Sequence, residues 1–329
     1  MKEYLGNTQQ VYGVEAYALK GGKADGMNML HVRSGGGMEF TVSADRCADI
    51  TRLAYKGNNF GLFTPVGHVA PEYYDRNGGF PRSFTGGMLT TCGLANAGSA
   101  CEDEGKFFPQ HGDIHATPAE NIYWDCDDKN IIIKAKIREA CFFGMNLVLN
   151  RTISCEVGGR TIKINDTVVN EGHSRVPLML LYHFNVGYPL LSENAELFVN
   201  SAEVCARDDE AQKGIGTYSQ IIKPINGYKE QCFYHKMRPD AYAAIFNGDI
   251  DCGLKISFDT STLNYFTQWK MMGEREYALG LEPANCHVQG RKKMREDGAL
   301  AYISPDESVS FSTELEMLDC RKSFEELLR

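Results

Sequence analysis

The chain has 329 residues and a mass of 36.7 kDa, with 43% hydrophobic and 23% charged residues, a balance typical of a folded protein and not of a disordered one. Its 34 basic residues stand against 43 acidic ones, a net charge of −9, which argues against nucleic acid or an anionic membrane as the main partner. No apolar run approaches the roughly 18 residues of a membrane span, and the N-terminus lacks the apolar core of a signal peptide, so we expect a cytoplasmic protein.

The first third of the chain offers two candidate arginines and a long irregular segment. Arg46 lies in the stretch 44–50 and Arg82 in the stretch 81–87, and each either binds substrate hydroxyls or a carboxylate or forms an ordinary ion pair. The segment 60–118 is rich in Gly, His and Arg. Because long loop-rich segments inside a folded protein are usually functional, we expect these loops to gather over one face of the fold.

Within this segment, His111, Asp113 and His115 alternate with Gly112 and Ile114. On a strand the three side chains would point to one face, where two imidazoles and a carboxylate can hold a metal as a facial triad. The alternative is that one histidine serves the substrate while the others hold loop backbone. Gly112 weakens a strand at this point, and we therefore predict no metal.

The middle of the chain has a hydrophobic period of two, which is typical of strands. Ile131, Ile133, Ala135 and Ile137 fall on one face of such a strand. Two further alternating runs, 147–156 and 161–169, are separated by a Gly-Gly turn and predict a hairpin. Turn residues at 125–130 and 247–249 predict two more hairpins.

Two polar residues follow the apolar run 178–182, which indicates a buried strand. His183 and Asn185 then share one face at its end. A single histidine on such a strand is often only a satisfied core residue, but the second polar group favours a functional site.

Glu282 follows a second apolar run, 277–281, and precedes Pro283 and Asn285. Burial of an unpaired carboxylate raises its pKa, which suits a general acid or base near neutral pH; the alternative is a surface glutamate at a strand end. Trp269 is one of two tryptophans. It is either a core residue or an aromatic face for stacking on the C–H surface of a sugar ring.

The C-terminal region repeats the strand pattern over 299–304 and 309–317, with a turn at 305–307. Helical pattern is scarce: a short helix is expected at 322–329 and a turn at 208–214. The amphipathic helices of 10 to 15 residues that a doubly wound α/β fold requires are missing, and no Pro/Ser-rich linker divides the chain. We therefore predict an all-β protein whose single domain spans residues 1–329.

The 11 cysteines include no C-x-x-C pair, which makes a zinc knuckle or a thioredoxin-like motif a poor interpretation. With an odd count and no export signal, we expect reduced thiols that are buried as small hydrophobes, Cys141 and Cys155 among them.

Three motifs in this order resemble the aldose 1-epimerase (galactose mutarotase-like) superfamily: His111-Gly112, His183-Phe184-Asn185 and Leu281-Glu282-Pro283-Ala284-Asn285. The stretches Asp45 to Ile50, Arg82 to Leu94 and Trp269 to Gly273 look like a less characterised branch of it. The resemblance covers about residues 25 to 318. It implies a β-supersandwich with few short helices that binds a monosaccharide at its concave face without a cofactor.

The resemblance also implies roles for individual residues in the interconversion of sugar anomers. Glu282 would be the general base on the C1 hydroxyl, and His183 the general acid on the ring oxygen. His111 would hydrogen-bond the substrate near that oxygen. Substrate binding is expected of a wider set: Arg46, Arg82, Asn185, Trp269, Asn285, His115 and Asp240, the last taken for the family's substrate-binding aspartate.

The chain departs from the mutarotase pattern at Tyr182, where mutarotases proper carry Asn, and at Asp113, where they carry Gly. These changes leave the sugar open, and Arg46 and Arg82 would suit an acidic or modified one. The leading hypothesis is a mutarotase-like isomerase of carbohydrate metabolism. The alternatives are a non-catalytic carbohydrate-binding protein and a metal-dependent sugar isomerase or lyase that uses His111, Asp113 and His115; a homodimer is left open.

Overall fold

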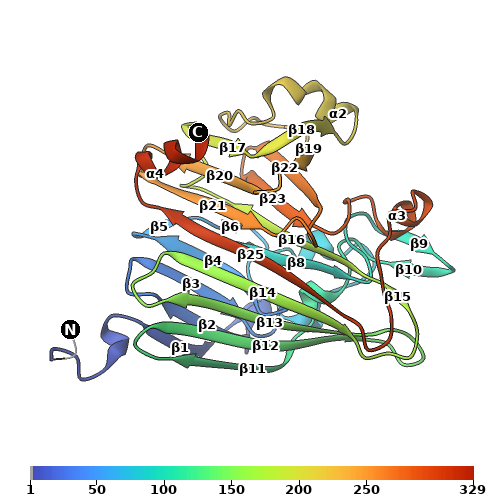
Figure 1. Ribbon diagram of the computed structural model, residues 1–329, viewed down its shortest axis with the longest axis horizontal. Coiled ribbons are helices and arrows are strands. Elements are labelled where there is room, and N and C mark those ends of the chain that lie inside the picture. The colour runs from blue at the N-terminus through green and yellow to red at the C-terminus, as the bar shows by residue number, and fades with distance from the viewer. Residues whose placement is uncertain (1–2) are drawn as a thin grey trace.

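The computed structural model describes residues 3–329 and is dominated by antiparallel strands (Figure 1). The larger of its two main sheets has eight strands in the spatial order β11 (Ala119–Cys126), β12 (Asn130–Ala140), β13 (Asn146–Glu156), β14 (Thr161–Asn170), β25 (Ser308–Leu318), β21 (Cys252–Phe258), β20 (Tyr242–Asn247) and β17 (Ala195–Val199). The other has six strands in the order β18 (Ser201–Ala206), β19 (Gln231–Met237), β22 (Tyr265–Gly273), β23 (Glu276–Ala284), β16 (Met179–Val186) and β8 (Leu89–Leu94).

The N-terminal strands form a third sheet, β1 (Gly13–Ala18), β2 (Asn28–Arg33), β3 (Met38–Ser43), β4 (Asp49–Tyr55) and β5 (Asn58–Asn59). Short two-stranded ribbons pair β6 (Leu62–Phe63) with β7 (Gly86–Gly87), β9 (Cys101–Asp103) with β10 (Lys106–Phe108), and β15 (Val176–Pro177) with β24 (Tyr302–Ile303). The α-helices are short: α1 (Phe80–Ser83), α2 (Asp209–Lys213), α3 (Arg291–Glu296) and α4 (Arg321–Glu325). Six 3₁₀ turns complete the described residues: η1 (Thr8–Gln10), η2 (Gly22–Ala24), η3 (Pro71–Tyr73), η4 (Ile114–Ala116), η5 (Ile215–Thr217) and η6 (Glu326–Leu328).

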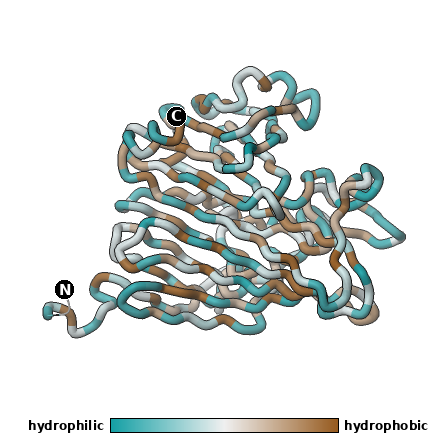
Figure 2. The backbone as a smooth tube through the Cα atoms, in the orientation of Figure 1, coloured by the Kyte–Doolittle hydropathy of each residue, from teal (hydrophilic) through white to brown (hydrophobic). Residues whose placement is uncertain are grey.

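One hydrophobic cluster takes side chains from all three of the larger sheets. On β12 the predicted residues Ile131, Ile133, Ala135 and Ile137 are buried and belong to this cluster. The alternation that produces this burial is visible along the long strands in Figure 2, where hydrophobic and hydrophilic residues follow one another. The all-β fold expected from this period is confirmed.

Strand β16 is buried on both faces, which decides where the site lies. Leu180, Tyr182 and Phe184 enter the main cluster, whereas Leu181 enters a second, smaller cluster. Because side chains alternate along a strand, His183 falls on the same face as Leu181. This face of the six-stranded sheet is therefore the one turned away from the main core.

The predicted hairpins at 125–130, 157–160 and 247–249 are confirmed by the pairs β11–β12, β13–β14 and β20–β21. The C-terminal pairing differs from the expected pattern. The stretch 299–304 keeps only the short strand β24, which pairs with β15 and not with β25. No helix within residues 3–329 has the length and apolar character to cross a membrane.

The expected terminal helix is present as α4 and η6, and the turn at 208–214 forms α2. The cysteines are free thiols, and Cys155 is buried in β13 as expected. The prediction for Cys141 is wrong, because this residue is exposed in the turn that follows β12.

Candidate functional site

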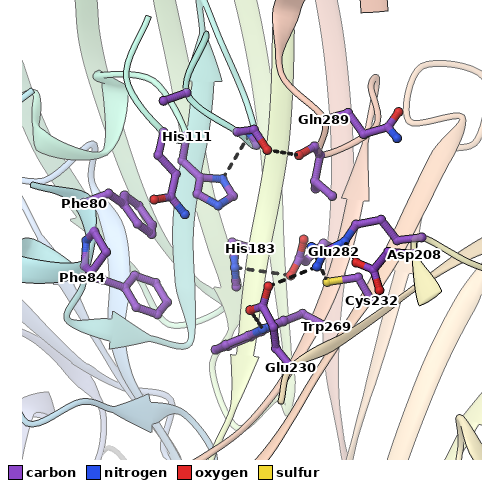
Figure 3. Close-up of a pocket in the computed structure, with 17 residues that line it drawn as sticks. Phe80, Phe84, His111, His183, Asp208, Glu230, Cys232, Trp269, Glu282 and Gln289 are labelled. Carbon is purple, nitrogen blue, oxygen red and sulfur yellow. Dashed lines mark hydrogen bonds and ion pairs between the residues drawn. The ribbon is translucent and has the colours of Figure 1, made fainter. Parts of the chain in front are cut away.

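A cavity of about 790 Å³ lies over the six-stranded sheet, on the face turned away from the main core (Figure 3). Its volume falls in the range of roughly 300–1,000 Å³ that small-molecule sites occupy. We call it the main pocket. Its lining includes Phe80, Phe84, His111, His183, Arg207, Asp208, Glu230, Cys232, Trp269, Glu282 and Gln289.

His183 and Glu282 face each other at the base of the main pocket. The antiparallel pairing of β16 with β23 sets Phe184 opposite Leu281, which brings the residues one step further along, His183 and Glu282, opposite each other. His183 Nε2 lies 3.3 Å from Glu282 Oε1, and both side chains are more than 90% buried. Within the described part of the chain, His183 Nδ1 and Glu282 Oε1 make no hydrogen bond, so polar capacity is left for a ligand.

Burial controls the charge of this pair. It raises the pKa of Glu282 to about 8, with a smaller contribution from the nearby Glu230 carboxylate, and lowers the pKa of His183 to about 3. Near neutral pH the carboxyl is therefore protonated and the imidazole is neutral. The two groups together hold one proton, which gives the pocket both an acid and a base.

His111 lies beside this pair as a neutral hydrogen-bond donor. Its ring centre is 5.6 Å from that of His183, and burial lowers its pKa to about 4. The backbone N–H of Gly98 donates to His111 Nδ1 at 3.4 Å. Since Nδ1 accepts, the ring proton belongs on Nε2, and His111 can donate to a ligand from that atom.

Aromatic rings form the adjoining wall of the main pocket. The ring of Trp269 lies 5.5 Å from His183 and 6.5 Å from Phe84, while Phe80 stacks on Phe84 at 5.1 Å. Trp269 Nε1 donates to Glu230 Oε2 at 2.8 Å, which fixes the orientation of the indole. This wall offers apolar ring faces next to the acid–base pair, as the sequence analysis proposed for Trp269.

A polar cluster that no sequence pattern indicated lies next to Trp269. Arg207 donates to Asp208 Oδ2 at 2.8 Å, to Glu230 Oε1 at 3.2 Å and to Cys232 Sγ at 3.0 Å. The residues belong to the β18–α2 connection and to the start of β19, and only strand pairing brings them to Trp269. Asp208 falls within a turn that the sequence indicated, but no pattern marked Arg207, Glu230 or Cys232.

The two arginines proposed as substrate ligands do not line the main pocket. Arg46 is buried behind the loops, where its Nη1 donates to the backbone oxygen of Val69 at 2.9 Å. Arg82 is exposed on helix α1, whose neighbouring residues Phe80 and Phe84 turn inward instead. The structure therefore does not bring these two arginines to the main pocket, where they would meet an acidic sugar.

The strand through His111, Asp113 and His115 that the metal alternative requires is not formed. His111 has a φ of 60°, and residues Ile114–Ala116 form the 3₁₀ turn η4. Asp113 forms a bidentate ion pair with Arg76 at 2.9–3.0 Å, and His115 is fully buried against the rings of Tyr74 and Phe80. No group of three or more His, Cys, Asp or Glu residues that could hold a metal occurs between residues 3 and 329.

The remaining predicted ligands lie outside the pocket lining, and the two asparagines among them hold backbone. Asn185 Nδ2 donates to the backbone oxygen of His183 at 2.8 Å. Asn285 accepts from Leu180 N at 2.7 Å and donates to Leu178 O at 3.0 Å, which fastens the end of β23 to β16. Asp240 is exposed in the turn between β19 and β20. The assignment of these residues, and of His115, to substrate contact is not supported by their positions.

Comparison with known proteins identifies the family and the fold. A family profile described as Domain of unknown function (DUF4432) matches residues 24–317. A search of curated proteins gives no match.

Solved structures resemble the chain over nearly its whole length. A candidate aldose 1-epimerase from Klebsiella pneumoniae superposes with a TM-score of 0.92 at 24% identity, covering 98% of this chain and 88% of that one. A galactose mutarotase-like protein from Clostridium acetobutylicum superposes with a TM-score of 0.66 at 15% identity, covering 94% of this chain and 99% of that one. Galactose 1-epimerase from Lactobacillus acidophilus superposes with a TM-score of 0.61 at 13% identity, covering 93% of this chain and 98% of that one. The fold is therefore the galactose mutarotase-like β-sandwich that the motifs indicated.

Proposed function

This chain belongs to the DUF4432 family, and on its mutarotase-like fold we propose that it is a sugar isomerase that interconverts the anomers of an aldose. The observation that carries the proposal is the buried His183–Glu282 pair, whose atoms lie 3.3 Å apart at the base of the main pocket. Anomer exchange requires one proton to be removed and one to be delivered, and this pair holds one proton between two basic atoms.

The proposed mechanism uses residues of this chain alone. A shift of the proton from Glu282 to His183 across their contact leaves a carboxylate that removes the proton of the C1 hydroxyl. The imidazolium then protonates the ring oxygen, the ring opens, the C1–C2 bond rotates, and the ring closes on the other face. His111 donates from Nε2 near the ring oxygen, and Trp269 supplies a face for the sugar ring.

The charges around the pocket support an uncharged sugar. Of the lining residues within the described chain, Arg207 is the one arginine, and the carboxylates of Asp208 and Glu230 already neutralise it. A sugar phosphate or uronate would meet these carboxylates without an unpaired cation to balance its own charge. Neutral aldoses are therefore the expected substrates.

The test is the rate of anomer exchange, measured by NMR over a panel of neutral, acidic and phosphorylated sugars. Glu282→Gln and His183→Asn are each expected to lower kcat/KM by about 10²–10⁴-fold, because positioned acids and bases contribute that much. Asp240→Asn, which changes an exposed carboxylate outside the pocket, serves as the control. Full exchange rates in both pocket variants would refute the assigned roles, and sugar binding by calorimetry without faster exchange would indicate a binding protein.

A further inference from the structure

A second cavity of about 600 Å³ adjoins the main pocket, and we call it the side pocket. Its lining includes Phe63, Tyr188, Met271, Arg275 and Ala278. The two pockets share four lining residues, Pro81, Phe84, Glu230 and Trp269. A ligand that stacks on Trp269 in the main pocket therefore has the side pocket as its next contact.

The pairing of β22 with β23 places the two pockets along one strip of the sheet. Glu282, Gly280 and Ala278 lie on the same face of β23, because side chains alternate along a strand. On the neighbouring strand β22, Trp269 pairs with Gly280 and Met271 pairs with Ala278. Four residues of strand from Glu282 to Ala278 span about 13 Å, which is longer than a single sugar ring. The acid–base pair thus lies at one end of the strip and the side pocket at the other.

Gly280 makes room for the shared tryptophan at the centre of this strip. A Cβ atom there would lie 2.5 Å from Glu282 Oε1 and 3.0 Å from Trp269 Cβ, so any side chain would push the indole or the carboxyl out of place. The glycine lets Trp269 lie between the two pockets, where its ring borders both.

The far end of the strip has the character of a carbohydrate subsite. Phe63 is 44% exposed and Tyr188 is 74% exposed. They come from segments far apart in the sequence, and both line the side pocket. Exposed aromatic side chains that converge on a groove mark a binding surface, and their faces suit the C–H surface of a sugar ring. Arg275 and Glu276 add exposed polar groups at the same end for hydroxyls.

We propose that the side pocket binds a second sugar ring, so that the substrate is a reducing oligosaccharide and not a free monosaccharide. This inference rests on the proposed function for its orientation. The reducing ring would place C1 at His183 and Glu282 in the main pocket. In a pyranose C4 lies across the ring from C1, so a ring linked through O4 would extend along the strip to Phe63 and Tyr188.

The first measurement compares sugars that share one reducing ring. Anomer exchange by NMR is followed for glucose and for its 4-linked disaccharides maltose, cellobiose and lactose. At least one disaccharide is expected to show a kcat/KM about tenfold or more above that of glucose. Equal values for glucose and every disaccharide would overturn the inference while leaving the proposed isomerase intact.

The second measurement locates the additional ring. Phe63→Ala and Tyr188→Ala alter exposed side chains outside the acid–base pair, and Phe142→Ala, a similarly exposed aromatic in the turn after β12, is the matched control. In the two pocket variants, kcat/KM for the preferred disaccharide is expected to fall about tenfold, whereas kcat/KM for glucose is expected to stay unchanged. An equal loss for both sugars would contradict a second-ring subsite.

Calorimetry separates the two proposals. A disaccharide that binds wild type more tightly than Tyr188→Ala, with no accelerated exchange of any sugar, would support the subsite and refute the isomerase. Failure of every disaccharide to bind would overturn the subsite whatever glucose does.

Discussion

At the scale of single residues, the central feature is one proton held between His183 and Glu282. Burial opposes charge on both groups, so the pKa of Glu282 rises to about 8 and that of His183 falls to about 3. Between these values the pair contains one proton, and its position on one partner or the other is a tautomeric choice. In the proposed mechanism, the active protonation state therefore extends across the neutral range.

This shared proton predicts the pH dependence of the reaction. Between about pH 4 and 7 kcat/KM should be nearly flat, and above about pH 8 it should fall as the pair loses the proton that the ring oxygen needs. Exchange rates measured from pH 5 to 10, with the uncatalysed rate subtracted, provide the check. A rate that continued to rise past pH 9 would show that ionised Glu282 acts alone as a base.

The site residues divide by whether local sequence marked them. His183 and Glu282 stood out because a polar residue at the end of an apolar strand is costly without a purpose. Both line the main pocket, as do His111 and Trp269. Arg207 and Glu230 could not be found in this way, since charged residues in connections are common and only their pairing with each other sets them apart.

At the scale of elements, a buried ionic network joins the strands beneath the site. Arg151 on β13 donates to Asp49 Oδ1 at 2.7 Å and to Asp166 Oδ2 at 2.7 Å, and its side chain is completely buried. Thr91 and Tyr182 donate to the same two carboxylates at 2.5 and 2.8 Å. The stretch 45–50, one of those that carry the family resemblance, thus contributes Asp49 to the core.

Removal of the cation from this network should be strongly destabilising. Arg151→Leu leaves Asp49 and Asp166 buried without their partner, which is expected to lower the free energy of unfolding by about 3–5 kcal/mol. Arg160→Ala removes an exposed ion pair with Asp319 and should cost at most about 1 kcal/mol. Urea unfolding of both variants gives the comparison, and equal losses would contradict the structural role assigned to Arg151.

At the scale of the whole molecule, each main sheet is assembled from distant parts of the chain. Strand β14 pairs with β25, and β16 lies between β8 and β23. The His111, His183 and Glu282 side chains come from three such regions and meet in one pocket. We propose on this basis that the described residues, 3–329, fold as one domain.

The two tryptophans allow this proposal to be tested. Trp124 lies on β11 of the eight-stranded sheet and Trp269 on β22 of the six-stranded sheet. Trp124→Phe and Trp269→Phe each leave one fluorescent reporter, and circular dichroism shows how far each substitution shifts global stability. In each variant the fluorescence and circular dichroism transitions in urea should coincide, because a single cooperative unit unfolds together. Separate midpoints for the two probes would show that the sheets unfold as independent domains.

The sequence by itself determined the all-β character, the strands and hairpins in the middle of the chain, and two residues, His183 and Glu282, that line the main pocket, because a period of two assigns each side chain to a face by a local rule. It left the segment 111–115 open between a strand and a loop, and the backbone there turns through a positive φ at His111 into η4. Only the tertiary structure decided that Arg46 and Asn285 hold backbone while Arg207 and Glu230 line the pocket. The physical reason is that strand pairing joins residues far apart in the chain, and their proximity leaves no trace in the local pattern.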